Sequence, residues 1–358
     1  MRADTSARAR RARGTRCATT ARAATVPPAV VSAMRVARAV LLAVVMMLTL
    51  SLLAVAQPAV AAGAADADSK TVPGADASPE PPPGGVQRIV SLVPSVTETV
   101  FALDRGDRLV GISTFCDYPP DEVRGIPRAG SYLTPSVETI VALRPDVVIG
   151  VPTPGNQTAV EQLRSLGVPV VIVGELTLDD TWQAIRTIGR WVGNEEGANA
   201  LVERIQAQIA EVRERASRVQ PRKVLFVVGH DPLVVAGKGL FIDELIGIAG
   251  GINVGAQSPG TWPRISLETV VAAAPEVIID GAMGSEAGAS LEAYWRPYTS
   301  VPAVRDGRLR AQSSDALLRP GPRVGLGAQQ LFDLIHADDA PSGARTPAAA
   351  DATPGPAA

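Results

Sequence analysis

The sequence predicts an α/β protein made of two Rossmann-like lobes joined by one long, rigid α-helix, and three observations support this. Short runs rich in valine and isoleucine alternate with segments of helical period, as in parallel sheets covered on both faces. The alternation stops over residues 181–219 and then resumes. Residues 137–150 (VETIVALRPDVVIG) are repeated at 267–280 (LETVVAAAPEVIID), with half of the positions identical.

The N-terminal lobe is expected over residues 86–180, where four apolar runs are separated by three helical patterns. The expected strands are Ile89–Val93, Leu109–Ile112, Val147–Val151 and Val170–Val173. The expected helices are Ser95–Ala102, Ser136–Ala142 and Gln157–Leu166.

A connecting helical segment is expected over residues 181–220. No strand pattern occurs between Thr181 and Val219, and Pro221 ends the segment. We interpret this stretch as one long helix, because a single helical stripe contains Leu201, Ile205, Ile209 and Val212.

The C-terminal lobe is expected over residues 221–337, where the alternation resumes. Its expected elements are strands Lys223–Val228, Val277–Asp280 and 308–311, and helices Phe241–Ala249, Leu267–Ala272 and Gly325–His336. The repeat falls once in each lobe at the same step: a serine cap, a helix, a proline and a strand. A helix followed by a proline and a strand recurs in α/β proteins in general, so chance can give that part of the repeat. Chance is less able to account for the Glu-Thr pair that both copies share.

Both ends of the chain are expected to lie outside the folded core. Residues 1–62 contain nine arginines and one acid, followed by the uncharged run 39–56 and then small-x-small sites, which is the layout of a secretory signal peptide. Met34 is an alternative start. The other interpretation is an uncleaved membrane anchor, which would make the protein a tethered sensor. Composition predicts disorder for residues 63–85 and 338–358.

Charge and cysteine content narrow the function classes. Without residues 1–62 the chain has 25 basic and 35 acidic residues, which argues against a general nucleic-acid binder. Cys17 lies in the signal region and Cys116 is then alone, so no internal disulfide is expected. Since no cysteine lies just after the apolar run, a lipid anchor is not expected and the mature protein should be soluble.

Catalytic signals are weak. The two histidines are His230, in a GHDP turn after a strand, and His336. The sequence has no nucleophile elbow, dinucleotide fingerprint, Walker motif or zinc-type spacing, so we predict no enzyme, no cofactor and no metal site. The alternative from another class is a small hydrolase using His230, which would require a serine or cysteine nucleophile beside the imidazole.

Four Gly/Pro-rich loops carry aromatic or charged residues, and these suit the binding of a large, flat, partly apolar ligand. They lie in both lobes, which favours a shared ligand cleft between the lobes, although each aromatic could instead cap a core edge. The loops are 113–120 (STFCDYPP), 129–135 (AGSYLTP), 258–264 (SPGTWPR) and 313–323 (SSDALLRPGPR).

Three stretches resemble the periplasmic cobalamin-binding proteins of ABC importers, within the class of helical-backbone receptors for iron–siderophore, haem and corrinoid ligands. They are RIVSLVPSVTETVFALDRGDRLVGISTFCDYPP, GSYLTPSVETIVALRPDVVIG and TWPRISLETVVAAAPEVII. The resemblance covers Gln87 to about Ile335 and implies two α/β lobes, one connecting helix and a ligand between the lobes.

The resemblance also implies roles for individual residues. Glu138 and Glu268 match the acids that dock onto arginines of a membrane permease dimer, one per lobe. The simpler alternative is that each glutamate only stabilises the start of its helix through the helix dipole. One departure is Val151-Pro152, where the cobalamin binders have a tryptophan. The residues that match ligand contacts are Phe115, Tyr132 and Trp262, as aromatics over the corrin, and Asp315 and Arg319, as polar contacts.

The sequence therefore predicts a monomeric, extracytoplasmic (periplasmic) solute-binding protein that captures a corrinoid, with cobalamin as the transported ligand, and delivers it to an ABC importer. The main alternative is the same fold binding a ferric siderophore or haem.

Overall fold

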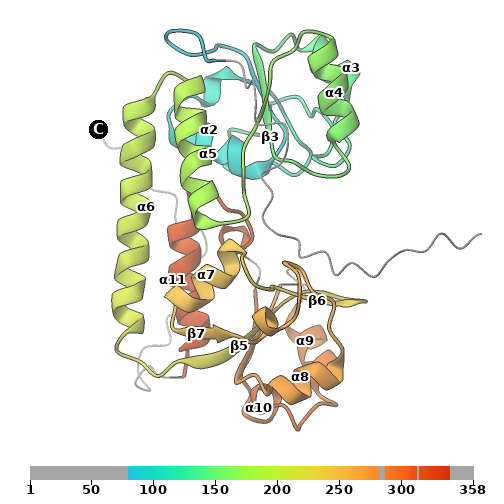
Figure 1. Cartoon of the computed structure of the whole chain (residues 1–358), viewed down its shortest axis with the longest axis vertical. Helices are drawn as coiled ribbons and strands as arrows, with labels where there is room; N and C mark the ends of the chain where they lie inside the picture. Colours follow the sequence, from blue (N-terminus) through green and yellow to red (C-terminus); the bar gives the residue numbers. More distant parts are fainter. Residues whose placement is uncertain (1–79, 282–286, 313, 339–358) are drawn as a thin grey trace, which may run out of the picture. The chain divides into compact units, whose positions relative to one another are not determined.

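The computed structural model describes residues 80–281, 287–312 and 314–338 (Figure 1). The described residues all belong to one compact unit, Pro73–Ala358. The predicted signal peptide, the alternative start Met34, residues 63–79 of the predicted linker and residues 339–358 of the predicted tail lie outside them.

The N-terminal lobe contains a four-stranded parallel sheet in the order β2-β1-β3-β4. Each expected strand is present, and its buried apolar residues account for the continuous valine and isoleucine runs. The strands are β1 (Ile89–Ser91), β2 (Leu109–Ile112), β3 (Val147–Gly150) and β4 (Val170–Ile172). The helices are α2 (Pro94–Ala102), η1 (Gly106–Arg108), α3 (Val137–Ala142) and α4 (Gln157–Ser165).

The connecting segment is two helices, so the expectation of one helix from Thr181 to Val219 is wrong. α5 (Leu178–Trp191) starts at a capping box of Thr177 with Asp180, and α6 (Glu195–Ala216) is the long helix. The chain turns between them because Gly193 has a φ of 64° and Asn194 caps α6 by accepting from the Gly197 N–H.

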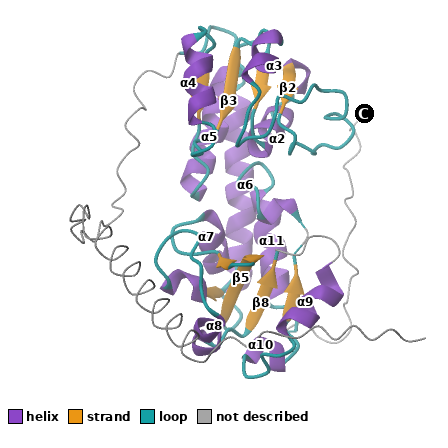
Figure 2. Ribbon diagram, turned by 90° about the vertical axis from the view of Figure 1, so that its right-hand side faces the viewer, coloured by secondary structure: helices purple, strands orange, loops and turns teal. Residues whose placement is uncertain are grey.

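The C-terminal lobe contains a five-stranded sheet in the order β6-β5-β8-β9, with β7 pairing the first part of β5. All pairs are parallel except β5 with β6. Figure 2 shows β5 and β8 as neighbours in this sheet. The sequence did not predict β6 and β7, which have three residues each. The strands are β5 (Arg222–His230), β6 (Leu233–Val235), β7 (Gly251–Asn253), β8 (Val277–Asp280) and β9 (Leu309–Ala311).

The helices of the C-terminal lobe surround this sheet. They are α7 (Phe241–Ile248), η2 (Val254–Gln257), α8 (Leu267–Ala273), α9 (Ala287–Trp295), α10 (Pro302–Arg305), η4 (Asp315–Leu317) and α11 (Val324–Ile335). One hydrophobic cluster contains core residues of both lobes together with α5, α6, α7 and α11. Helix α6 packs on both α5 and α11, so the apolar stripe predicted on it joins the two lobes.

The sequence repeat is also a structural repeat. Ser136 and Ser266 cap α3 and α8 by accepting from Thr139 N–H and Thr269 N–H. Other positions 130 residues apart are also alike. Ile140 and Val270 are both buried, and Arg144 and Ala274 both have positive φ, of 46° and 50°. Asp146 accepts a backbone N–H just before β1, and Glu276 accepts one within β5. Each copy builds the same helix-to-strand corner.

No helix among the described residues is long and apolar enough to cross a membrane.

Candidate functional site

The carboxyl ends of the strands bring the predicted ligand residues of the N-terminal lobe together. Phe115 follows β2, and its ring meets that of Tyr132 edge to face at 5.4 Å between centroids. Arg128 holds the Phe115 loop by donating to the carbonyls of Ser113 and Cys116 at 3.1 and 2.6 Å. Tyr132 packs on the core, whereas Phe115 is 51% exposed. An aromatic surface therefore lies at the sheet edge where open α/β folds bind ligands.

Trp262 lies on a loop that pairs with β6 in the C-terminal lobe. The N–H groups of Val235 and Gly237 donate to the carbonyls of Pro263 and Thr261 at 3.1 and 2.8 Å. A Cβ at Gly237 would lie 2.3 Å from the carbonyl oxygen of Gly260, so only glycine allows this close approach. The indole is 43% exposed, and no ring contact among the described residues joins it to Phe115 or Tyr132.

Exposed apolar side chains collect on the loops at these strand ends. Among the described residues, ten large hydrophobic side chains are exposed, and half of them belong to such loops: Phe115, Leu133, Leu176, Trp262 and Leu318. Exposed apolar surface of this kind commonly marks a binding site.

Two arginines of the C-terminal lobe reach an acid of the N-terminal lobe. Glu98 on α2 is 3% exposed and forms a two-pronged ion pair with Arg323, the residue just before α11. Arg323 Nε donates to Oε2 at 2.8 Å and Nη2 donates to Oε1 at 2.7 Å. Arg319 donates to the same carboxylate at 3.3 Å. Sequence reasoning missed Glu98 and Arg323, although a glutamate within the apolar helix PSVTETVFA was a visible signal.

The DYPP motif supplies a second connection between the lobes. Asp117 accepts from both Nη atoms of Arg319, with the Nη2–Oδ2 distance at 3.1 Å, and the Arg323 guanidinium lies 3.9 Å from the Tyr118 ring centroid. Asp315 Oδ2 lies 2.9 Å from Arg319 Nη2. The structure thus brings Asp315 and Arg319 together and pairs Arg319 with three carboxylates.

The electrostatics of this cluster follow from its geometry. Burial works to lower the pKa of Arg319, but the hydrogen bond to Asp117 and the charges of Asp315 and Glu98 outweigh it, and the pKa rises. The hydrogen bond from Arg319 lowers the pKa of Asp117. Both partners are therefore charged at neutral pH.

Glu175, beyond β4 on the same edge, is perturbed in the opposite direction. Burial raises its pKa to about 7, and a hydrogen bond with Ser95 offsets this only in part. Between pH 4.5 and 7 the folded state holds this proton more tightly than the unfolded chain, so the free energy of unfolding falls as pH rises, by up to about 3 kcal/mol.

We therefore expect Glu175→Gln to raise stability at pH 8 by about 1–3 kcal/mol and to flatten the pH dependence between pH 5 and 8. Urea unfolding of both proteins at the two pH values measures this. The exposed Glu161→Gln serves as the control and should leave the slope unchanged. An equally steep pH dependence in Glu175→Gln would contradict the assignment.

His230 is held between a buried acid and an aromatic ring. Its Nε2 lies 2.7 Å from Oδ2 of the buried Asp280, and its ring stacks on Tyr294 at 4.0 Å between centroids. Its Nδ1 is buried and has no hydrogen-bond partner among the described residues. In the described part of the chain, no serine or cysteine hydroxyl or thiol is hydrogen-bonded to the imidazole.

Three other residues singled out in the sequence are structural. Cys116 is buried, with Thr97 Oγ1 donating to its Sγ at 3.1 Å, and burial raises the pKa of its thiol. His336 is buried, with Nε2 3.0 Å from the carbonyl oxygen of Ala249. Val151, where the cobalamin binders have a tryptophan, is a core residue with 1% exposure.

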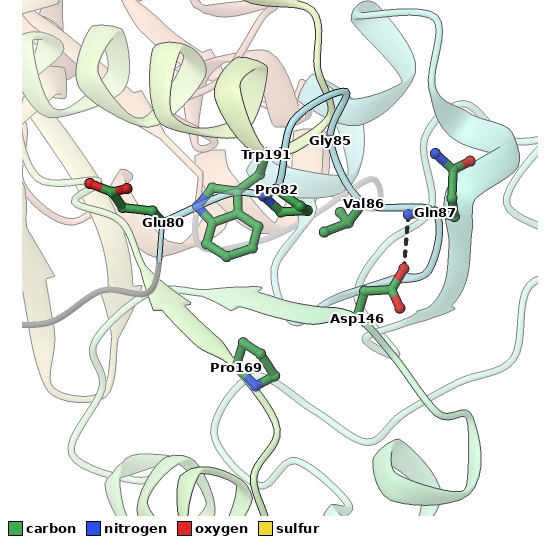
Figure 3. Close-up of a pocket in the computed structure, with 8 residues that line it drawn as sticks. All are labelled: Glu80, Pro82, Gly85, Val86, Gln87, Asp146, Pro169 and Trp191. Atoms are coloured by element: carbon green, nitrogen blue, oxygen red, sulfur yellow. Dashed lines mark hydrogen bonds between the residues drawn. The ribbon is translucent and has the colours of Figure 1, made fainter.

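A pocket of about 380 Å³ lies at the opposite edge of the N-terminal sheet (Figure 3). Asp146 and Pro169 precede β3 and β4, and Trp191 ends α5. Asp146 accepts from the Gln87 N–H at 2.9 Å, which ties the chain entering β1 to this edge. The pocket contains none of the predicted ligand residues, so we do not assign the ligand to it. Its lining is Glu80, Pro82, Gly85, Val86, Gln87, Asp146, Pro169 and Trp191.

The predicted docking residues are exposed. Glu138 and Glu268 each lie in the first turn after their serine cap. A hydrogen bond with Ser266 lowers the pKa of Glu268, so this carboxylate stays ionised.

Comparison with known proteins identifies the family of this two-lobed fold. A family model described as periplasmic binding protein matches residues 89–316. The chain belongs to the periplasmic binding protein family. Members of this family and its structural neighbours are solute-binding proteins, not enzymes. The two-lobed α/β fold predicted from the sequence is confirmed.

Individual relatives of this periplasmic binding protein carry different ligand names. A vitamin B12-binding protein of Pectobacterium atrosepticum is 30% identical over 265 residues, which cover 72% of this chain and 92% of that protein. The periplasmic heme-binding protein RhuT from Roseiflexus sp. RS-1 has a TM-score of 0.65 and 32% identity, covering 71% and 99%. The periplasmic vitamin B12 binding protein BtuF of Vibrio cholerae has a TM-score of 0.63 and 26% identity, covering 71% and 98%.

Proposed function

We propose that this periplasmic binding protein captures a corrinoid such as cobalamin between its lobes and delivers it to an ABC importer in the membrane. The ligand would lie on the aromatic surface of Phe115, Tyr132 and Trp262. Its rim would meet Asp315 and Arg319. Capture outside the cytoplasm follows if residues 1–62 act as the signal peptide.

The observation that carries the choice of cargo is the pairing of the arginines. Both Arg319 and Arg323 are already bound by carboxylates at the facing edges of the lobes. A haem or a ferric chelate brings its own carboxylates or other anionic groups, which would have to approach the exposed carboxylates of Asp117 and Asp315. A corrin ring carries neutral carboxamides, whose N–H groups are suitable donors to the exposed oxygens of Asp117 and Asp315.

Haem is the second candidate, because a neighbour at 32% identity is named for it. Absorption spectra distinguish the candidates directly. We would incubate the purified full chain with cyanocobalamin, hemin or a ferric siderophore, remove free ligand by gel filtration, and record the visible spectrum of the protein peak. A corrinoid spectrum at one ligand per chain is expected; retention of hemin or siderophore alone would reject the proposal.

Aromatic truncations should weaken this binding. Trp262→Ala and Tyr132→Ala each remove a ring face worth about 0.5–1.5 kcal/mol beyond its burial, so each should weaken cyanocobalamin binding by several-fold to about tenfold. Titration of the variants measures the loss. Leu166→Ala, which truncates an exposed side chain at the end of α4, is the control. Unchanged affinity in both aromatic variants would place the ligand elsewhere.

A further inference from the structure

The ion pairs of Arg319 determine which charges are available at the facing edges of the lobes. Its side chain is 16% exposed, and its two Nη atoms are shared among Glu98, Asp117 and Asp315. Of these carboxylates, only Asp117 combines contact with both Nη atoms and wide exposure, since 62% of its side chain is accessible. Asp117 is thus the partner that an incoming ligand can meet.

The three carboxylates play different parts. Glu98 is buried and is bound mainly by Arg323, so it belongs to the packed contact between the lobes. Asp315 lies one helical turn before Arg319 on the same lobe. Asp117 comes from the opposite lobe, in the loop that also carries Phe115. Removing the charge of Asp117 would therefore free much of the Arg319 guanidinium next to the loop that carries Phe115, and it would leave the Glu98–Arg323 pair in place.

We propose that Asp117 is a specificity-determining residue: by holding the guanidinium of Arg319 it withholds that charge from ligand carboxylates, and so selects an uncharged, amide-bearing cargo over an anionic one. This inference rests on the proposed function and names the cargo chemistry that the same site accepts. An anionic group would have to displace Asp117 from Arg319, or remain beside a carboxylate of like charge. A carboxamide can donate to Asp117 without breaking the pair.

The test compares ligands that differ in charge and little in shape. The probes are cyanocobalamin, which is neutral overall, its monocarboxylic acids, in which one carboxamide has become a carboxylate, and hemin, a planar dicarboxylate. We would titrate the wild type, Asp117→Asn, and the double variant Asp117→Asn with Arg319→Gln. The control is Asp121→Asn, because Asp121 lies in the same stretch of chain and, within the described part of the protein, its ion pair is with the exposed Arg124.

We expect Asp117→Asn to shift the ratio of monocarboxylate to cyanocobalamin affinity, and hemin affinity, by on the order of tenfold in favour of the anion. Asp121→Asn should leave the ratio unchanged. The double variant should lose the gain, because the charge that attracts the anion is absent. If Asp117 only held the lobes together, its replacement would affect the affinities for neutral and anionic ligands alike and would leave their ratio unchanged.

Other outcomes would overturn the inference. An unchanged ratio in Asp117→Asn rejects it while leaving the proposed function standing, provided that the wild type binds cyanocobalamin. A gain that persists in the double variant shows that Arg319 does not attract the anion. If the wild type binds no cyanocobalamin, the proposed function fails. Hemin titration of the same variants then still decides the role of Asp117.

Discussion

Glu98→Ala is expected to lower the free energy of unfolding by about 3–5 kcal/mol, the usual cost of removing one partner from a buried ion pair. Glu98 is 3% exposed, and its carboxylate is the shared acceptor of Arg323 and Arg319. Without it, the guanidinium groups of Arg319 and Arg323 remain close together, largely withdrawn from water, with less counter-charge. The loss also removes a contact between α2 of one lobe and the segment before α11 of the other.

Chemical denaturation with circular dichroism measures this effect, and hydrogen exchange localises it. Protection should fall in α2 and around Arg323 before it falls in the sheets. The matched control is Glu214→Ala, which breaks an exposed i,i+4 pair with Arg218 and should cost at most about 1 kcal/mol. A loss for Glu98→Ala no larger than that of Glu214→Ala would show that the pair does not hold the lobes.

Much of the fold could be predicted from the sequence because its signals are local. Buried parallel strands such as β1 and β3 appear as continuous apolar runs between helical segments. The division between α5 and α6 was missed, although Gly193-Asn194 followed by two glutamates is a helix stop and start signal. Strands β6 and β7 were missed, because they lack long apolar runs and their pairing with β5 depends on the fold.

The candidate site was predictable only in part. Phe115, Tyr132 and Trp262 stood out because aromatic residues in Gly/Pro-rich loops are a local pattern. The partners of the arginines were not visible, since Glu98 and Arg323 are separated by 225 positions. Asp117 was noticed within DYPP, but its role depends on a residue of the opposite lobe. Contacts of this kind arise only when both lobes are folded.

The repeated helix corners lead to the second large effect, on transport. Glu138 and Glu268 lie on α3 and α8, and Figure 1 shows each helix on the side of its lobe away from α6. Equivalent caps, buried residues and positive-φ positions give the two carboxylates the same local setting. Two matched anions, one per lobe, suit a two-fold symmetric permease that offers two basic patches.

The double variant Glu138→Ala with Glu268→Ala should therefore slow complex formation with the permease by at least about tenfold at low salt and reduce uptake, while cyanocobalamin affinity stays at the wild-type value. Each single variant should produce part of the loss, and the difference from wild type should shrink as salt screens the charges. Surface plasmon resonance against the reconstituted importer and uptake in whole cells are the two readouts.

Glu161→Ala with Glu292→Ala removes two exposed acids from α4 and α9 and is the matched control. Loss of cyanocobalamin binding in the docking variant would move the pair into the ligand site. Normal uptake at physiological salt would mean that the repeat encodes only a shared way of starting a helix.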